Sequence, residues 1–97
     1  MKNKQMKMGE LIKEYRIMRG MTQIELSKLL GFSTSQFISL IERDLSKTPL
    51  YLIGKMHIIL DIPEKKLIEI SMSTYEIEVR AEIEVGKKEA LPIKRAK

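Results

Sequence analysis

The sequence predicts a mainly α-helical domain of five short helices, followed by a C-terminal extension. Apolar residues recur at helical spacing between residues 8 and 70, and glycines and prolines separate the periodic stretches. The 97 residues are 43% hydrophobic and 32% charged, a balance typical of a single folded domain. We therefore divide the chain into a flexible basic arm (1–7), a helical domain (8–70), a C-terminal dimerisation segment (71–86) and a flexible basic tail (87–97).

The first two predicted helices are delimited by glycines. A helical pattern begins at Met8 and stops at Gly20, a residue that commonly ends helices. Thr22 is a good N-cap for the second helix, and Glu25 three residues later completes a T-x-x-E capping box. Gly31 ends this second helix.

Three further helices are predicted before residue 71. The third covers residues 34–42. Thr48 followed by Pro49 opens the fourth, since proline is favoured at the first helical position, and this helix runs to about Leu60. Pro63 opens a short fifth helix. Five short helices with tight turns make a compact all-α domain.

The extension shows a different period, because apolar residues alternate strictly with charged ones: Tyr75, Ile77, Val79, Ala81, Ile83 and Val85. This alternation predicts a β-strand with one buried face, which would join two copies of the chain in a homodimer through residues 75–85. The alternative is a sixth helix that starts at Ser73, where Glu76 completes a capping box. Its apolar stripe would be Ile68, Met72, Tyr75, Val79 and Ile83.

Composition excludes several function classes. The chain has no cysteine and only one histidine, His57, which excludes disulfides, cysteine-based zinc sites and histidine-rich metal sites. No catalytic Ser-His-Asp set, carboxylate dyad or glycine-rich phosphate loop can be assembled. Apolar runs are too short for a membrane span, and the N-terminus lacks a signal peptide's apolar region. We therefore expect a cytoplasmic protein that is not an enzyme and has no cofactor, metal or membrane partner.

Charge is distributed unevenly along the chain. The net charge is +5 over residues 1–60, −4 over residues 61–86 and +4 over residues 87–97. A basic body with a basic tail is the electrostatic pattern expected for a polyanion partner.

The second and third helices are joined by the tight turn Gly31-Phe32-Ser33, an arrangement typical of a helix-turn-helix motif. In such a motif the second helix of the pair enters the major groove of DNA, where short polar side chains reach base edges. The candidate base-reading residues on this helix are Thr34, Ser35, Gln36, Ser39 and Leu40.

The segments TQIELS (22–27) and ISLIER (38–43), together with Arg16 and Gly31, resemble the lambda-repressor/Cro-type (XRE-like) helix-turn-helix family over about residues 9–70. The resemblance implies base reading by Ser35 and Gln36, with Ser39 and Leu40 one turn further on. It also implies a structural ion pair between Arg16 and Glu42. The phosphate contacts that it implies are Thr22, Gln23, Ser33, Arg43, Ser46, Lys47 and Thr48. Asp44 departs from the family pattern, which commonly has glycine there.

These observations predict a sequence-specific double-stranded DNA-binding transcriptional regulator, a repressor, that binds a palindromic operator as a homodimer. We expect it to be associated with the nucleoid and to be of prokaryotic or phage origin. One alternative is an antitoxin that uses the same domain for autoregulation and its C-terminal segment to bind a toxin protein. A third interpretation is an interaction module that has lost DNA binding, which the basic charge of residues 1–60 disfavours.

Overall fold

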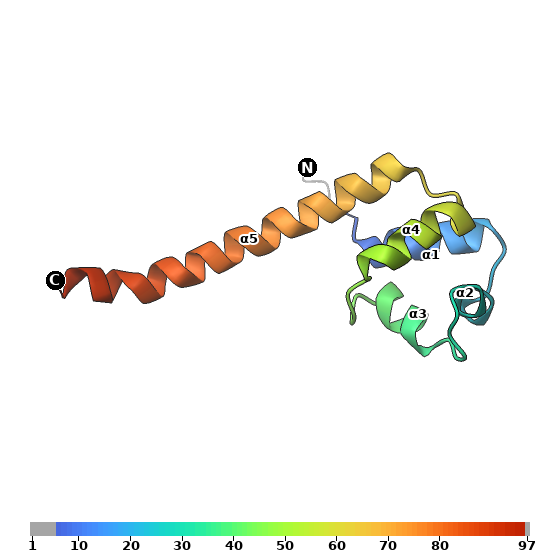
Figure 1. Cartoon of the computed structure of the whole chain (residues 1–97), viewed down its shortest axis with the longest axis horizontal. Helices are drawn as coiled ribbons and strands as arrows, with labels where there is room; N and C mark the ends of the chain where they lie inside the picture. Colours follow the sequence, from blue (N-terminus) through green and yellow to red (C-terminus); the bar gives the residue numbers. More distant parts are fainter. Residues whose placement is uncertain (1–5, 97) are drawn as a thin grey trace, which may run out of the picture.

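Five helices follow one another along the described part of the chain (Figure 1). The first four helices and the first turns of the fifth form the body of the molecule, and the rest of the fifth helix projects from it. The computed structural model describes residues 6–96. The helices are α1 (Met8–Met18), α2 (Gln23–Leu29), α3 (Gln36–Glu42), α4 (Leu50–Leu60) and α5 (Glu64–Arg95). The molecule measures 61 × 34 × 22 Å because α5 projects far beyond the other helices.

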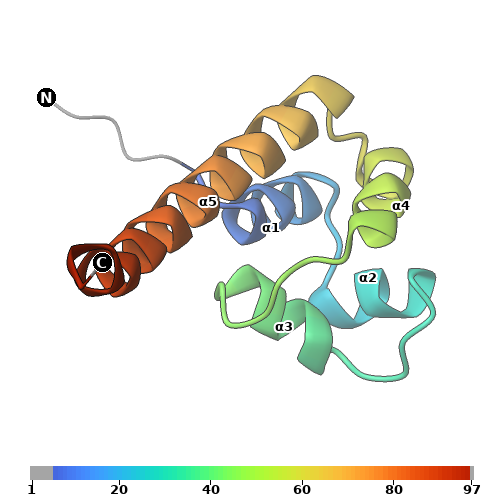
Figure 2. The same ribbon diagram turned by 60° about the vertical axis from the view of Figure 1, so that its left-hand side comes forward.

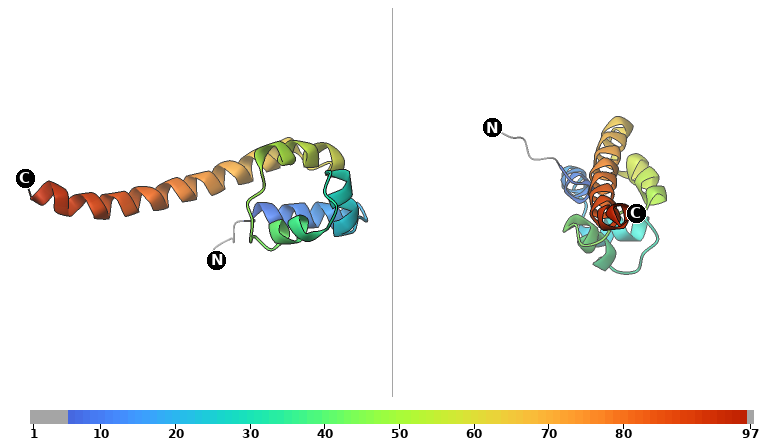
Figure 3. Two further views of the ribbon diagram at one scale, coloured as in Figure 1. Left: turned by 60° about the horizontal axis from the view of Figure 1, so that its bottom comes forward. Right: turned by 90° about the vertical axis from the view of Figure 1, so that its left-hand side faces the viewer.

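The body has two ends. In Figure 2, α2 and α3 lie at one end of the body and the first turns of α5 at the other, with α1 between them; in the left view of Figure 3, α1 lies between α3 and α4. Twelve hydrophobic side chains form one buried core: Leu11, Ile12, Tyr15, Leu26, Leu30, Ile38, Ile41, Leu52, Met56, Leu60, Ile62 and Leu67. Residues of α2 and α3 therefore pack into the same core as residues of α1 and α4.

Local sequence signals explain most of the helix starts. The predicted capping box of α2 is confirmed: the Glu25 N–H donates to Thr22 Oγ1 (3.1 Å), and the Thr22 N–H donates to Glu25 Oε1 (2.7 Å). The predicted start of the fourth helix is one residue too early, because Pro49 rather than Thr48 is the residue that precedes α4. Pro63 precedes α5 in the same way.

The predicted strand over residues 75–85 is wrong, since these residues lie inside α5, and no strand occurs between residues 6 and 96. The separate sixth helix is not formed either, because Ser73 lies within α5 rather than at its start. A strand needs a neighbouring strand for its backbone hydrogen bonds, whereas a helix satisfies its own. Side-chain pairs also support the helix, as in the 2.7 Å contact between Arg80 and Glu76.

The sequence predicts that both ends of the chain are flexible, and the structure describes them to different extents. The expected flexible tail over residues 87–97 is helical through Arg95, with Pro92 inside the helix. The expected flexible arm over residues 1–7 lies mostly outside the described residues. Its last residue, Lys7, is the N-cap of α1. No described helix has the length and apolar character needed to cross a membrane.

Candidate nucleic-acid interface

The α2–turn–α3 unit forms a helix-turn-helix with a well-packed interior. Gly31 in the turn has a φ of +95°, a conformation that glycine adopts without steric cost. The rings of Phe32 and Phe37 pack with centroids 5.1 Å apart and so join the turn to α3. Ile38 and Ile41 point into the core, which fixes the face of α3 that remains outside.

The outward face of α3 carries three of the predicted base-reading residues. Gln36, Ser39 and Leu40 have the spacing i, i+3 and i+4, so they share one face, and Arg43 continues it one turn later. Gln36 is exposed, whereas Ser39 and Leu40 are half-buried. This face therefore presents an amide, a hydroxyl and an apolar side chain before it reaches a cation.

The remaining predicted base readers lie in the turn before α3, because this helix begins at Gln36 and not at residue 34. Ser35 is the N-cap of α3, although its side chain makes no cap hydrogen bond. The Gln36 N–H donates instead to Thr34 Oγ1, at 3.4 Å. Ser33 and Thr34 are both exposed in this turn.

Arg16 and Glu42 form an ion pair that joins α1 to the end of α3. Arg16 Nε lies 2.6 Å from Glu42 Oε2, Arg16 Nη2 lies 3.0 Å from Oε1, and both residues are buried. The hydrogen bond to Glu42 raises the pKa of Arg16 above its ordinary value, so the guanidinium stays charged. Because Arg16 also donates to the Met21 carbonyl (2.7 Å), this cation fixes the orientation of α3 and the start of α2 together.

Gln23, a predicted phosphate contact, takes part in the same network. Its Nε2 donates to Glu42 Oε1 at 3.0 Å, and the residue is half-buried at the start of α2. Thr22 is exposed beside it. The Glu42 carboxylate thus accepts bonds from α1 and α2 and exposes little negative charge toward the interface.

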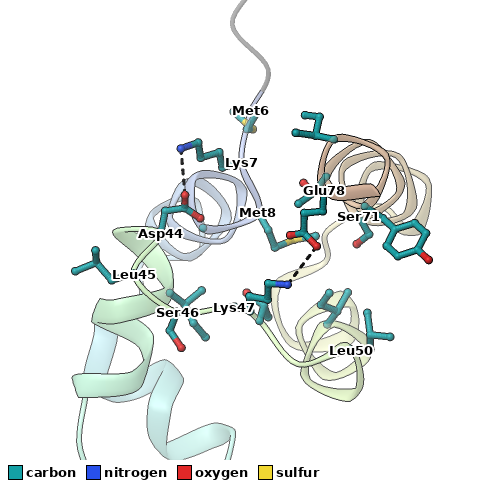
Figure 4. A pocket seen from close by; sticks show the side chains of 17 residues that line it. Met6, Lys7, Met8, Asp44, Leu45, Ser46, Lys47, Leu50, Ser71 and Glu78 are labelled. Atoms are coloured by element: carbon teal, nitrogen blue, oxygen red, sulfur yellow. Dashed lines mark hydrogen bonds and ion pairs between the residues drawn. The ribbon is translucent and has the colours of Figure 1, made fainter. Parts of the chain in front are cut away.

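The loop after α3 holds the other predicted phosphate contacts, and its two ion pairs are shown in Figure 4. Asp44 adopts a left-handed conformation (φ 61°), which explains why the family favours glycine there, and its carboxylate pairs with Lys7 at 3.1 Å. Lys47 reaches across to Glu78 on α5, with Nζ and Oε1 3.2 Å apart. Arg43 is exposed, and Ser46 and Thr48 are half-buried.

A groove of about 640 Å³ separates this loop from α5. Its lining is mostly apolar and includes Met8, Leu45, Leu50 and Ile53, while the ion pair between Lys47 and Glu78 crosses it (Figure 4). The part of α5 between Ser71 and Glu78 is therefore adjacent to the predicted phosphate-binding loop.

Comparison with known protein families identifies the chain. A family model described as helix-turn-helix matches residues 12–67, more than half of the sequence. The chain belongs to the lambda-repressor/Cro-type (XRE-like) helix-turn-helix family. This is a family of DNA-binding transcriptional regulators. Neither the curated proteins nor the solved structures gave a significant match.

The sequence did not predict the residues that reach the candidate interface only through tertiary contacts. Glu78 lies 31 positions from Lys47, and Lys7 lies 37 positions from Asp44, so no local pattern indicates either pair. Gly9 was missed as well, because its significance is the close approach of α3 to α1.

The single histidine and the residue types that bind metal ions are further candidates for chemistry. Within residues 6–96, no group of three or more His, Cys, Asp or Glu side chains is placed to hold a metal ion. His57 lies within 2.6 Å of the Ile62 carbonyl through Nδ1, so it connects α4 to the segment before α5.

Proposed function

We propose that this helix-turn-helix protein is a sequence-specific transcriptional repressor that reads the major groove of DNA with the outward face of α3. The observation that carries this proposal is the uncharged face of Gln36, Ser39 and Leu40, followed by the exposed cations Arg43 and Lys47. Uncharged polar groups can discriminate between bases. Cations mainly bind phosphate, and the strength of that contact depends little on the base sequence.

Each side chain has a role that follows from its chemistry. The Gln36 amide can form two hydrogen bonds with adenine, and Leu40 can contact a thymine methyl group. Ser35 and Ser39 can bond to either base type, and Thr34 flanks them in the turn. The phosphate contacts would come from the ends of the motif, at Thr22, Gln23, Ser33, Arg43, Ser46, Lys47 and Thr48.

Repression requires that the site be recognised with enough specificity to occlude a promoter. One short recognition helix reads few base pairs, so we propose that two copies bind half-sites of a palindromic operator. The regulator would act in the cytoplasm, on the nucleoid of a prokaryotic cell.

Selection of bound sequences from a random DNA pool, followed by affinity measurements on variants, tests the reading role. Gln36→Ala should cost about 1–3 kcal/mol at the preferred site and relax the preference at one or two base pairs. Lys47→Ala should weaken binding to all DNA sequences similarly and reduce the magnitude of the slope of log affinity against log salt by about one. Equal, sequence-independent losses in both variants would contradict the assigned roles.

The second candidate function is that of an antitoxin, which the long exposed helix α5 favours. Its apolar side chains beyond the body could bind a toxin protein. Expression together with the neighbouring genes of its source genome, followed by purification, tests this candidate. A stoichiometric partner that is toxic alone would support it, and a chain that purifies alone would favour the repressor.

A further inference from the structure

One face of α5 carries an apolar stripe that the body leaves uncovered. Its large members, Ile68, Met72, Tyr75 and Ile83, are each more than half exposed. The stripe continues through small residues to the helix end, at spacings of three and four that keep it on one face: Ile68, Met72, Tyr75, Val79, Ile83, Gly86, Ala90 and Ile93. The bulkiest residues therefore lie in the N-terminal half of the stripe, and its two small residues, Gly86 and Ala90, lie in the C-terminal half.

We propose that this stripe pairs with the same stripe of a second copy, antiparallel and centred near Ala81. The inference specifies the dimer on which the proposed operator recognition rests. In this register four contacts form, and each recurs by symmetry: Ile68 with Ile93, Met72 with Ala90, Tyr75 with Gly86, and Val79 with Ile83 of the second copy.

Side-chain size favours the antiparallel direction. The bulky Tyr75 and Met72 meet Gly86 and Ala90, so the two largest side chains of the stripe face its two smallest residues. A parallel pair in register would instead place Tyr75 against Tyr75 and Gly86 against Gly86. Crowding at one level and a gap at another would follow from that arrangement.

Charges along one flank of the stripe are complementary in the same register. Glu69 meets Lys94 of the second copy, and Glu76 meets Lys87, with both contacts repeated by symmetry. Within one chain Glu76 contacts Arg80 at 2.7 Å and Lys87 contacts Glu84 at 2.9 Å, so the contact between the copies would join two existing pairs. Exposed pairs of this kind contribute little affinity but help to set register and direction.

The other flank carries Glu78 and Glu82, which approach the same residues of the second copy. Like charges here oppose pairing, and Lys47 from the body reduces this repulsion through its 3.2 Å contact with Glu78. The unfavourable flank is thus the one that receives a cation from the body.

The register also places the two bodies suitably for DNA. Leu67, the last core residue on α5, precedes the pairing centre by 14 residues, so the two anchor points lie about 40 Å apart at 1.5 Å per residue. This distance is near one turn of B-DNA, about 34–36 Å. The stripe lies about a third of a turn around α5 from Leu67. A two-fold axis perpendicular to the pair therefore keeps both bodies on one side of the paired helices.

Cysteine cross-linking tests the direction and register, because the chain has no cysteine of its own. The double variant Met72→Cys/Ala90→Cys should form a disulfide-linked dimer, as should an equimolar mixture of the two single variants. Neither single variant should cross-link alone, since positions 72 and 90 lie about 27 Å apart along the helix. Cross-linking of a single variant alone, or a chain that sediments as a monomer, would overturn the proposal.

Charge exchange provides an independent readout by sedimentation. Lys87→Glu should weaken the dimer by about 2- to 10-fold, and adding Glu76→Lys should restore it. Lys88→Glu, the same change on the opposite face of α5, is the matched control and should have little effect. If the Lys87→Glu/Glu76→Lys variant dimerised no more tightly than Lys87→Glu alone, the register would be contradicted. Both readouts are made without DNA, so their failure is separate from failure of the Gln36→Ala test.

Discussion

Two side chains of the interface are held by carboxylates of the protein itself. Gln23 donates to Glu42, and Lys47 pairs with Glu78 on α5. A phosphate that binds Lys47 must compete with the Glu78 carboxylate for the same ammonium group. With the proposed phosphate role of Lys47, α5 would therefore influence DNA affinity through the single residue Glu78.

Glu78→Gln should tighten DNA binding by about 1.5- to 5-fold per domain, because an exposed ion pair contributes about 0.2–1 kcal/mol. The gain should disappear when Lys47→Ala is also present, since the competition acts through that ammonium. Affinity measurements at fixed salt check this result. Glu82→Gln, which removes the same charge from the same flank, is the control, and an equal gain in that variant would show that only the net charge matters.

The capping box of α2 makes stability depend on pH. The N–H of Thr22, and then its side chain, bond to Glu25 and lower the pKa of this carboxyl below its usual value. A lowered pKa in the folded state stabilises the fold above the unfolded value, near pH 4.3, and this contribution disappears as the pH falls through the folded pKa.

Glu25→Gln should therefore lower the thermal midpoint at pH 7, and the difference from the parent should shrink toward zero as the pH is lowered through the folded pKa of this carboxyl. Thermal unfolding of both proteins across this range measures the effect. Glu14→Gln, which removes one exposed charge from α1, is the control for net charge. A difference that does not change with pH would contradict the role of the carboxylate.

At the scale of elements, α1 and α3 approach each other closely at Gly9. A Cβ atom built on Gly9 would lie 2.0 Å from the Ile41 carbonyl oxygen, which is backbone and cannot rotate away. The helices can meet this closely only because position 9 has no side chain. The approach sets α3 against α1 near the ion pair between Arg16 and Glu42.

Gly9→Ala should destabilise the protein by about 1–3 kcal/mol or more, because α1 and α3 must separate. Gly54→Ala is the matched control: it lies within α4 with no atom within 4 Å of its built Cβ, so alanine should stabilise by about 0.5–1 kcal/mol. Denaturant unfolding measures both free energies. A Gly9→Ala variant as stable as the parent would show that the helices can shift at no cost.

Alternation in residues 75–85 was a misleading signal at this scale. The spacing of apolar residues predicts which residues share a face once the type of secondary structure is known. A strand also requires a neighbouring strand, and the spacing does not show whether one is present. On α5 the alternating apolar residues divide between two faces. Val79 and Ile83 join the outer stripe, and Ile77 borders the groove beside the body.

At the scale of the whole molecule, α5 is both part of the core and an arm beyond it. Leu67 is buried and Ile70 packs against the core, whereas the rest of the helix has much less contact with the body. Isolated helices are marginal in water, so a second chain would stabilise the projecting part.

Truncation after Ser73 should leave a folded helical domain that is monomeric, because Leu67 and Ile70 remain in place. Operator affinity should fall about 100-fold or more, since two linked half-sites are lost. Circular dichroism, sedimentation and DNA binding measure the three properties. A truncated protein that stays dimeric would contradict the role of α5, and one that unfolds would show that the removed segment belongs to the core.

The sequence by itself determined the helix-turn-helix motif, since the capping box of Thr22 and Glu25, the glycine turn and the family segments are all local. It also predicted which residues of α3 face outward, apart from the exact helix start. The tertiary structure decided what depends on distant neighbours: the Gly9 contact, the pairing of Lys47 with Glu78, and the helical form of α5. Local hydrogen bonds and backbone geometry are encoded in adjacent residues, whereas these contacts depend on how the packed helices bring distant residues together.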